Sequence, residues 1–342
     1  MKQFNNGKKT AMITGIAGMV GSHLADYLLT HTDLNVVGFL RWNEEQDNLE
    51  HLFPEINRAE RLDLFFGDLN DQSSLTSCVT EYQPDYVFHL AAQSYPQTSF
   101  VAPIDTLNTN ILGTAKLLEA IRLSKLQPVV HICASSEVFG KVPKQYIPIN
   151  EEAPFHPASP YAISKVGTDL LGRYYAEAHG LTVMTTRMFT HTGPRRGDVF
   201  AESTFAKQIA MIEAGLIEPK IKVGNLQSLR TWADVRDAVR AYYMLVTINP
   251  QAGEYYNIGG TYSCTIGEML DYLIQQSTAE NIEIVQDPSR LRPIDADLQV
   301  PDTSKFTNHT GWKPQITFQQ TMNDLLEYWR ERVNARGEFL TR

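Results

Sequence analysis

Cysteine, clustered positive charge and long apolar runs are all scarce in this chain of 342 residues. Its three cysteines, Cys78, Cys133 and Cys264, are too widely spaced for a zinc motif, so we expect buried thiols, no metal site and a reducing cytoplasmic location. No run of lysine or arginine offsets the net charge of −9, which disfavours nucleic acid and anionic membranes as partners. Apolar stretches such as Val129–Cys133 are too short to span a bilayer, and the polar Met1–Thr10 is not typical of a signal peptide.

The first half of the chain instead shows a regular alternation of strand-like and helix-like segments. Short apolar runs are separated by segments with helical periodicity, and this order predicts parallel βαβ units in a doubly wound Rossmann sheet, an α/β fold. The predicted strands are Thr10–Thr14, Asn35–Leu40, Leu62–Phe66, Tyr86–Leu90, Val129–Ala134 and Thr182–Met188, and the predicted helices include Val20–Thr30, Thr106–Ser124 and Tyr161–His179.

The second half of the chain is less regular. Helix-like segments near Ser203–Ala214, Ile266–Gln276 and Phe318–Val333 alternate with polar loops, and Glu254–Ile258 is strand-like. The pattern predicts a smaller mixed C-terminal lobe that is interleaved with the sheet. We expect residues 1–188 to form the sheet domain, with residues 235–260 returning to it, and residues 189–234 and 261–342 to form the smaller lobe.

Three glycines, Gly15, Gly18 and Gly21, lie between the first strand and its helix. The first permits a tight turn, the second lets the backbone approach a pyrophosphate, and the third lets helix and strand pack closely. The free N–H groups of the helix start, around Met19 and Val20, then meet the phosphates. Glycines also punctuate ordinary turns, but this position after the first strand favours a dinucleotide site.

The residue at the end of the second predicted strand bears on cofactor choice. An acidic residue there binds a ribose 2′-hydroxyl and rejects a 2′-phosphate, but this strand ends in Leu40-Arg41-Trp42. Arg41 offers a charged fork to a phosphate, which favours NADP over NAD. The alternative is a solvated surface arginine.

Tyr161 and Lys165 are four residues apart on a predicted helix and so lie on one face. A nearby ammonium favours the phenolate and lowers the pKa of the tyrosine from about 10, which gives a base that works near neutral pH. Ser135, at the end of a predicted strand, can hydrogen-bond the substrate oxygen that Tyr161 deprotonates. Pro160 suits the first turn of the helix.

Glu137 follows Ser135 by two residues. A dehydrogenase or a C4-epimerase needs only the serine, the tyrosine, the lysine and the nicotinamide. A 4,6-dehydratase must also remove a proton from C5 of a hexose and expel the C6 hydroxyl, which requires a second acid/base. Glu137 is our candidate for that group, and a solvated loop carboxylate is the alternative.

The glycine spacing and the set Ser135, Tyr161 and Lys165 resemble the extended short-chain dehydrogenase/reductase superfamily. In that superfamily the position of Asp68 contacts adenine, although Asp68 can also cap the next helix. The resemblance places the cofactor at Gly15, Gly18, Met19, Val20, Gly21, Arg41, Asp68, Leu69, Ala91, Ala92, Tyr161 and Lys165.

Three later segments, His191–Asp198, Gly224–Arg230 and Arg292–Asp295, resemble those of GDP-mannose 4,6-dehydratases, with Thr231 where that family has Asp. The resemblance implies a GDP-sugar substrate, with Arg230 and Arg292 at the diphosphate and Asp295 at a sugar hydroxyl of the nucleotide. The substrate-binding residues implied in this way are Ser94, Arg196, Asn225, Arg230, Arg292 and Asp295.

The resemblance covers nearly the whole chain and implies a 4,6-dehydratase that moves a hydride from C4 to C6 with loss of water. Ala91–Phe100 and Arg292–Lys305 look closest to GDP-N-acetylglucosamine 4,6-dehydratases of legionaminic acid synthesis, so GDP-N-acetylglucosamine or GDP-mannose is the expected substrate. The dehydratases carry Thr-x-Glu where this chain has Ser135-x-Glu137, and some GDP-4-keto-6-deoxymannose reductases carry Ser-Ser-Glu. A reductase or an epimerase is therefore the alternative. We expect a homodimer or homotetramer.

Overall fold

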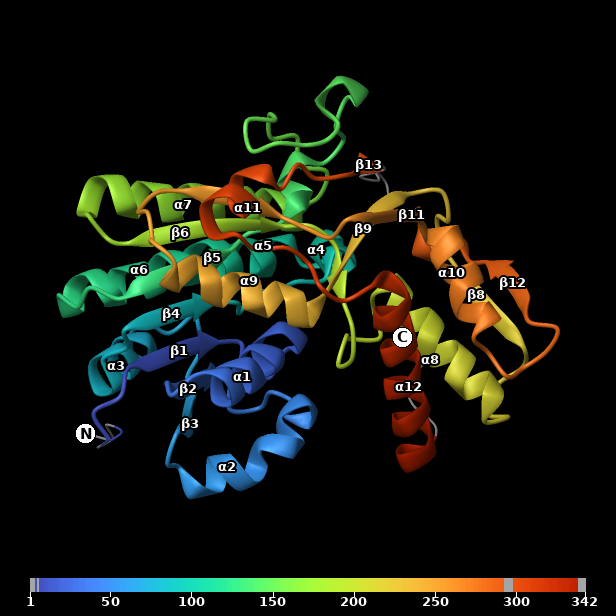
Figure 1. Cartoon of the computed structure of the whole chain (residues 1–342), viewed down its shortest axis with the longest axis horizontal. Coiled ribbons are helices and arrows are strands. Elements are labelled where there is room, and N and C mark those ends of the chain that lie inside the picture. Colours follow the sequence, from blue (N-terminus) through green and yellow to red (C-terminus); the bar gives the residue numbers. More distant parts are fainter. Residues whose placement is uncertain (1–3, 5, 292–297, 338–342) are drawn as a thin grey trace.

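The computed structural model describes residue 4, residues 6–291 and residues 298–337 (Figure 1). Seven strands form one sheet in the order β3-β2-β1-β4-β5-β6-β10, and every neighbouring pair is parallel. The predicted Rossmann sheet is confirmed. Its strands are β1 (Thr10–Thr14), β2 (Asn35–Leu40), β3 (Leu62–Phe66), β4 (Tyr86–His89), β5 (Val129–Cys133), β6 (Val183–Met188) and β10 (Tyr255–Ile258).

Helices cover both faces of the sheet (Figure 1). Successive residues of β1 point to opposite faces, so Ile13 packs in the core under α1 and α9, whereas Met12 packs with α3, α6 and α7. Phe306 and Trp312 also belong to the first of these cores, although they lie far along the chain. The helices are α1 (Met19–His31), α3 (Gln72–Tyr82), α6 (Gly113–Ser124), α7 (Pro160–His179), α9 (Val235–Thr247) and α11 (Ser304–Thr310).

A smaller lobe with its own apolar core lies beside the carboxyl ends of the sheet strands (Figure 1). The helices α8, α10 and α12 enclose this core, and Trp232, Phe318 and Trp329 are its large side chains. Its elements are β7 (His191–Thr192), α8 (Ala201–Glu213), β8 (Lys220–Val223), β9 (Leu229–Asp234), β11 (Tyr262–Thr265), α10 (Ile266–Gln275), β12 (Glu283–Gln286), β13 (Leu298–Gln299) and α12 (Phe318–Arg336).

The predicted helix Thr106–Ser124 is in fact interrupted. α5 (Pro103–Leu107) leads into a π-helical turn at Asn108–Leu112, and only then does α6 begin. Within the turn, the buried Asn110 side chain bonds groups outside the helix, and π-helical turns frequently occur at functional sites. The remaining short helices are η1 (Asp47–Leu52), α2 (Phe53–Arg58), α4 (Pro96–Val101), η3 (Ser136–Phe139), η4 (Lys144–Tyr146) and η5 (Pro288–Arg290).

Three expectations from composition can be compared with the described part of the chain. All three cysteines are free thiols; Cys78 and Cys264 are buried, whereas Cys133 is half-buried and lines the cleft considered next. No helix among the described residues is long and apolar enough to cross a membrane. The same residues contain no group of three or more His, Cys, Asp or Glu side chains arranged to hold a metal ion.

Candidate active site

A cleft of about 1380 Å³ lies between the carboxyl ends of the sheet strands and the smaller lobe. Parallel sheets bind ligands at this edge. Arg292 and Asp295 lie outside the described residues. All the other predicted site residues line the cleft: Gly15, Gly18, Met19, Val20, Gly21, Arg41, Asp68, Leu69, Ala91, Ala92, Ser94, Ser135, Glu137, Tyr161, Lys165, Arg196, Asn225 and Arg230.

The glycine turn after β1 has the geometry of a phosphate cradle. Gly15 has φ +73°, and a Cβ there would lie 2.8 Å from Ala91 Cα; a Cβ on Gly21 would lie 2.2 Å from the Gly15 carbonyl oxygen. A Cβ on Gly18, however, would meet no heavy atom closer than 3.3 Å. The fold therefore requires Gly15 and Gly21, whereas Gly18, beside the start of α1, is less crowded and close only to the Gly15 carbonyl oxygen. The first turn of α1 has neither a capping side chain nor an acidic residue, so its N–H groups are available to an anion.

A buried threonine–histidine chain ties the ends of β1 and β4 together. Thr14 Oγ1 accepts hydrogen bonds from the Leu90 and Ala91 N–H groups, both at 3.1 Å, and lies 2.9 Å from His89 Nδ1. His89 Nε2 lies 2.9 Å from Thr114 Oγ1 on α6. Burial lowers the pKa of His89 to about 3, so the ring is neutral. These bonds hold the cleft-lining backbone around Ala91 against the glycine turn.

Arg41 lies at the end of β2 with its side chain 61% exposed, which leaves the guanidinium accessible from the cleft. Its Nε lies 3.5 Å from Glu44 Oε2, and Glu44 also lines the cleft. The sequence pattern did not point to this carboxylate. A 2′-phosphate at Arg41 would have to displace or outweigh it.

Asp68 follows β3 and lines the cleft, but it does not cap the next helix. Its Oδ1 accepts a hydrogen bond from the Asn70 N–H at 2.7 Å. Asp71 is the N-cap of α3, and its carboxylate accepts from the N–H groups of Ser73 and Ser74. The helix-cap interpretation of Asp68 was therefore wrong, and its carboxylate shapes the turn at the cleft instead.

Tyr161 and Lys165 lie in the first two turns of α7, which begins at Pro160 and is capped by Ser159. Both side chains are largely buried, at 8% and 6% exposure. Lys165 Nζ donates to the Cys133 carbonyl oxygen at 2.8 Å and lies 5.9 Å from the centre of the Tyr161 ring. The backbone at the end of β5 thus holds the lysine.

Several groups act on the ionisation of Tyr161. Burial raises its pKa, whereas the Ser135 hydroxyl and the positive charge of Arg196 lower it and the charge of Glu137 raises it. Burial also lowers the pKa of Lys165. The sequence pointed to Lys165 as the cation that lowers the pKa of Tyr161, but burial raises that pKa overall, and the cation that lowers it is Arg196, from a segment remote in sequence.

Glu137 lies in the short helix η3, directly after β5. Ser135 caps this helix, because its Oγ accepts from the Glu137 N–H at 3.2 Å. The Glu137 side chain is half-buried, lines the cleft, and has no hydrogen-bond partner among the described residues. It is not a fully solvated loop carboxylate, and it faces the same space as Tyr161 and Ser135.

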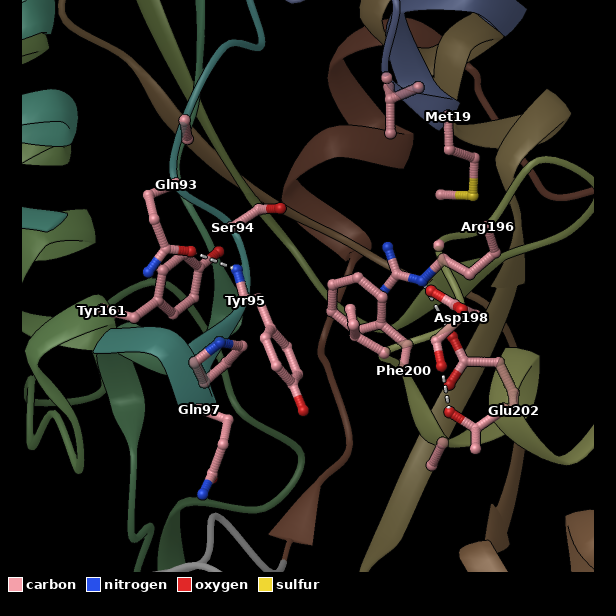
Figure 2. A pocket seen from close by; sticks show the side chains of 18 of the residues that line it. Met19, Gln93, Ser94, Tyr95, Gln97, Tyr161, Arg196, Asp198, Phe200 and Glu202 are labelled. Carbon is pink, nitrogen blue, oxygen red and sulfur yellow. Dashed lines mark hydrogen bonds and ion pairs between the residues drawn. The ribbon is translucent and has the colours of Figure 1, made fainter. Parts of the chain in front are cut away.

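The lobe side of the cleft presents Arg196, opposite Tyr161 (Figure 2). Arg196 Nε donates to Glu202 Oε1 at 3.1 Å, and the guanidinium lies 3.4 Å from the centre of the Phe200 ring. Phe200 in turn meets Tyr95 edge-on, with ring centres 5.7 Å apart. This contact joins the loop after β4 to the segment before α8 across the cleft.

The outer end of the cleft is formed by the lobe. Arg230, on β9, is 9% exposed and donates through Nη1 to the Leu229 carbonyl oxygen at 3.2 Å. Asn225 Nδ2 donates to Ser228 Oγ at 3.1 Å. Cleft residues that the sequence reasoning missed here are Tyr95, Phe200, Glu202, Lys207, Gln208, Lys222 and Arg290. Tyr95 lay within the recognised segment Ala91–Phe100, and Phe200 and Arg290 each lay two residues from a recognised segment.

A family model described as GDP-mannose 4,6 dehydratase matches residues 12–325. The chain belongs to this family. Among its relatives, a GDP-6-deoxy-D-mannose reductase of Pseudomonas aeruginosa is 32% identical over 94% of this chain and 97% of that protein. A GDP-mannose 4,6-dehydratase of Vibrio cholerae is 31% identical over 93% of each, and GDP-mannose 4,6 dehydratase 1 of Arabidopsis thaliana is 32% identical over 97% and 94%.

Solved structures support the same family and fold. The structure of RMD from Pseudomonas aeruginosa complexed with NADPH superposes with a TM-score of 0.81 at 31% identity, covering 95% of this chain and 100% of that one. A UDP-glucose 4-epimerase from Thermotoga maritima gives a TM-score of 0.83 at 24% identity, covering 95% and 99%, and this likeness shows the fold alone. The predicted membership of the GDP-sugar dehydratase and reductase group is confirmed.

Proposed function

We propose that this protein is an NADP-dependent GDP-sugar 4,6-dehydratase. The observation that carries the proposal is the position of Glu137. It gives the cleft a second acid/base beside Ser135, Tyr161 and Lys165, and all four line the same cavity as the glycine turn. A simple dehydrogenation needs no such group, whereas removal of a C5 proton does.

The shape of the glycine turn supports a bound dinucleotide. Gly15 and Gly21 leave no room for a side chain, Gly18 is the least crowded of the three, and the uncapped start of α1 suits a pyrophosphate. Arg41 supports NADP as the specific cofactor, as does the NADPH in the related Pseudomonas structure. A bound NADP would supply the acceptor for the hydride that leaves C4 and the donor for the hydride that reaches C6.

Tyr161 is the proposed base for the first half of the reaction. Its phenolate takes the proton of the 4-hydroxyl, and Ser135 orients the same oxygen by a hydrogen bond. Lys165 contributes a fixed positive charge, held by the Cys133 carbonyl at the floor of the cleft. The resulting 4-keto group makes the C5 proton acidic.

Glu137 is the proposed base for the second half. Its carboxylate takes the C5 proton, and the same carboxyl group then protonates the C6 hydroxyl as it leaves as water. The half-buried position of Glu137, with no protein partner for its side chain among the described residues, leaves the carboxylate available for both transfers.

The end of the cleft at the smaller lobe is the proposed binding site of the nucleotide. We propose that Arg230 and Arg292 bind the diphosphate, that Asp295 binds a hydroxyl of the nucleotide, and that Ser94, Arg196 and Asn225 complete the substrate site. GDP-mannose and GDP-N-acetylglucosamine are the proposed hexose donors. The second would place the protein in legionaminic acid synthesis, and the segment Ala91–Phe100 beside the sugar supports it.

A GDP-4-keto-6-deoxy-sugar reductase is the second candidate, because the Pseudomonas relative of that name is as similar as the dehydratases. Incubation with a panel of GDP-hexoses, followed by product mass, separates the two. A dehydratase product is lighter by about 18 mass units, one water, and needs no added NADPH. A reductase leaves the GDP-hexoses unchanged and consumes NADPH with a 4-keto substrate.

We also propose that the protein is a cytoplasmic homodimer or homotetramer. Three free thiols suit a reducing compartment. Ile163, Leu170 and Tyr174 lie on one face of α7 and are 50%, 48% and 55% exposed, and Leu123 at the end of α6 is 59% exposed. An apolar helical face of this kind suits burial against a second copy. Light scattering of Leu170→Asp against the wild type tests this, because a monomer is expected only for the variant.

A further inference from the structure

Arg196 is a buried cation that uses little of its hydrogen-bonding capacity. Its side chain is 17% exposed, and Nε donates to Glu202. The guanidinium lies 3.4 Å from the centre of the Phe200 ring, and this contact restricts its movement. Of its five N–H donors, the four on the terminal nitrogens have no acceptor among the described residues. They face the cleft, into which the side chain points (Figure 2).

The reacting groups lie across the cleft from this cation. Tyr161 and Ser94 come from the sheet side and Arg196 from the lobe side, with Tyr95 and Phe200 between the two walls (Figure 2). The electrostatic influence is mutual: Arg196 lowers the pKa of Tyr161, and Tyr161 raises the pKa of Arg196. The other titratable groups that interact electrostatically with one or the other are Cys133, Glu137, His191, Glu202 and Tyr242. Lys165 Nζ also lies 5.9 Å from the centre of the Tyr161 ring.

We propose that Arg196 is a catalytic residue of the elimination, stabilising negative charge on the Tyr161 phenolate and then on the C4 oxygen of the sugar. The inference rests on the proposed dehydratase function. When Glu137 takes the C5 proton, the C5–H electron pair forms a C4–C5 double bond and the carbonyl pair moves to oxygen. The oxygen pair then re-forms the ketone, and the C4–C5 pair moves to form a C5–C6 double bond. The C6–O pair leaves with the hydroxyl, which takes the proton from Glu137 and departs as water.

The proposed role of Arg196 differs from that of an arginine that binds the diphosphate. A phosphate ligand stabilises bound substrate and transition state alike, so its loss raises KM and weakens GDP itself. A cation at the C4 oxygen acts only as charge develops, so its loss lowers kcat. The two roles therefore predict different variants of the enzyme.

The test compares Arg196→Gln with Arg195→Gln. Arg195 is the adjacent arginine, and its Nη1 lies 2.7 Å from Asp26 on the sheet side. For Arg196→Gln we expect kcat to fall by about 10²-fold, with GDP affinity close to the wild type. Because the positive charge lowers the pKa of Tyr161, its loss should also move the acid limb of the kcat/KM profile upward by about one pH unit. Arg195→Gln and Arg196→Lys should keep the limb in place.

Glu202→Gln is a second variant, which keeps the proposal testable if Arg196→Gln does not fold. It removes the negative partner of Arg196, so the acid limb should move to lower pH, opposite to Arg196→Gln. An unchanged limb and kcat in Arg196→Gln, or a loss of GDP affinity that matches the loss of kcat/KM, overturns the proposal. If the wild type releases no water, the dehydratase function fails instead. The pH profile then still tests Arg196 in a reductase reaction, where Tyr161 donates a proton to the ketone and its pKa sets the alkaline limb, which should move upward in Arg196→Gln.

Discussion

Asn110 Nδ2 donates to Ser164 Oγ at 2.8 Å, which joins the π-helical turn to the first turns of the catalytic helix α7. The same amide also accepts from the Gln93 N–H at 2.8 Å and donates to the Gln93 carbonyl at 3.0 Å. Ser164 Oγ in turn donates to the Tyr161 carbonyl oxygen at 2.6 Å. One side chain therefore fixes the position of the loop after β4 relative to the catalytic helix.

Asn110→Ala should destabilise the protein by about 1–3 kcal/mol, because it leaves buried polar groups without partners. The free energy of unfolding in urea measures this. Asn108→Ala, an exposed residue in the same turn, is the control and should stay within about 0.5 kcal/mol of the wild type. Equal stability of the two variants would show that other contacts fix the loop after β4 relative to the catalytic helix.

This turn also shows which parts of the fold could be predicted from the sequence and which could not. The strands β1, β2 and β3 have the predicted bounds, because apolar runs between turn residues identify them directly. The π-helical turn was missed because its cause, the reach of Asn110 to Gln93 and Ser164, lies in tertiary contacts. Local periodicity carries no trace of such contacts.

The residues of the candidate site also fall into two groups, those that the sequence predicted and those that it did not. Gly15, Tyr161 and Lys165 were found because their spacing has a physical meaning within one element. The contact of Phe200 with Arg196 and the position of Arg196 opposite Tyr161 join segments remote in the chain, and no spacing rule predicts them. The sequence therefore pointed to the cofactor turn and the acid/base set more completely than to the walls of the sugar site.

The three glycines of the turn should respond differently to alanine. Gly21→Ala places a methyl group against the Gly15 carbonyl and should cost about 1–3 kcal/mol of stability. Gly18→Ala meets the Gly15 carbonyl oxygen at 3.3 Å, so it should cost less stability than Gly21→Ala, but the methyl group occupies the approach of the pyrophosphate. We expect NADP affinity to fall by about tenfold, or about 1.4 kcal/mol, as measured by calorimetry. Unchanged NADP affinity in Gly18→Ala would place the pyrophosphate elsewhere.

Arg41 should discriminate between the two cofactors. Arg41→Ala removes a charged partner of the 2′-phosphate and should weaken NADP by about 1.5–3 kcal/mol while leaving NAD affinity nearly unchanged. Arg58→Ala is the matched control, because Arg58 also pairs with a glutamate three residues away and is similarly exposed. Glu44→Gln should strengthen NADP binding, since it removes the carboxylate beside Arg41. Equal wild-type affinities for NAD and NADP would contradict the proposed selectivity.

Glu137 separates a dehydratase from a reductase or an epimerase. Glu137→Gln keeps the size of the side chain but cannot accept the C5 proton. Oxidation at C4 should still proceed, while elimination slows by about 10²–10⁴-fold. The expected signature is absorbance of enzyme-bound NADPH that appears with the GDP-hexose and persists, without a 6-deoxy product.

Deuterium incorporation at C5 tests the same role of Glu137 without relying on absorbance. In deuterated solvent the wild type should incorporate deuterium at C5, because the proton that Glu137 removes leaves with the water and C5 is protonated again from the solvent when the hydride reaches C6. Glu137→Gln should not incorporate it. Tyr161→Phe is the control, since it blocks the earlier step and should show neither NADPH absorbance nor exchange at C5. Full dehydration by Glu137→Gln would assign the C5 proton to another group. A wild type that exchanges nothing at C5 and loses no water from any GDP-hexose would leave the reductase as the function that the site supports, because reduction of a 4-ketone needs Tyr161 but no base at C5.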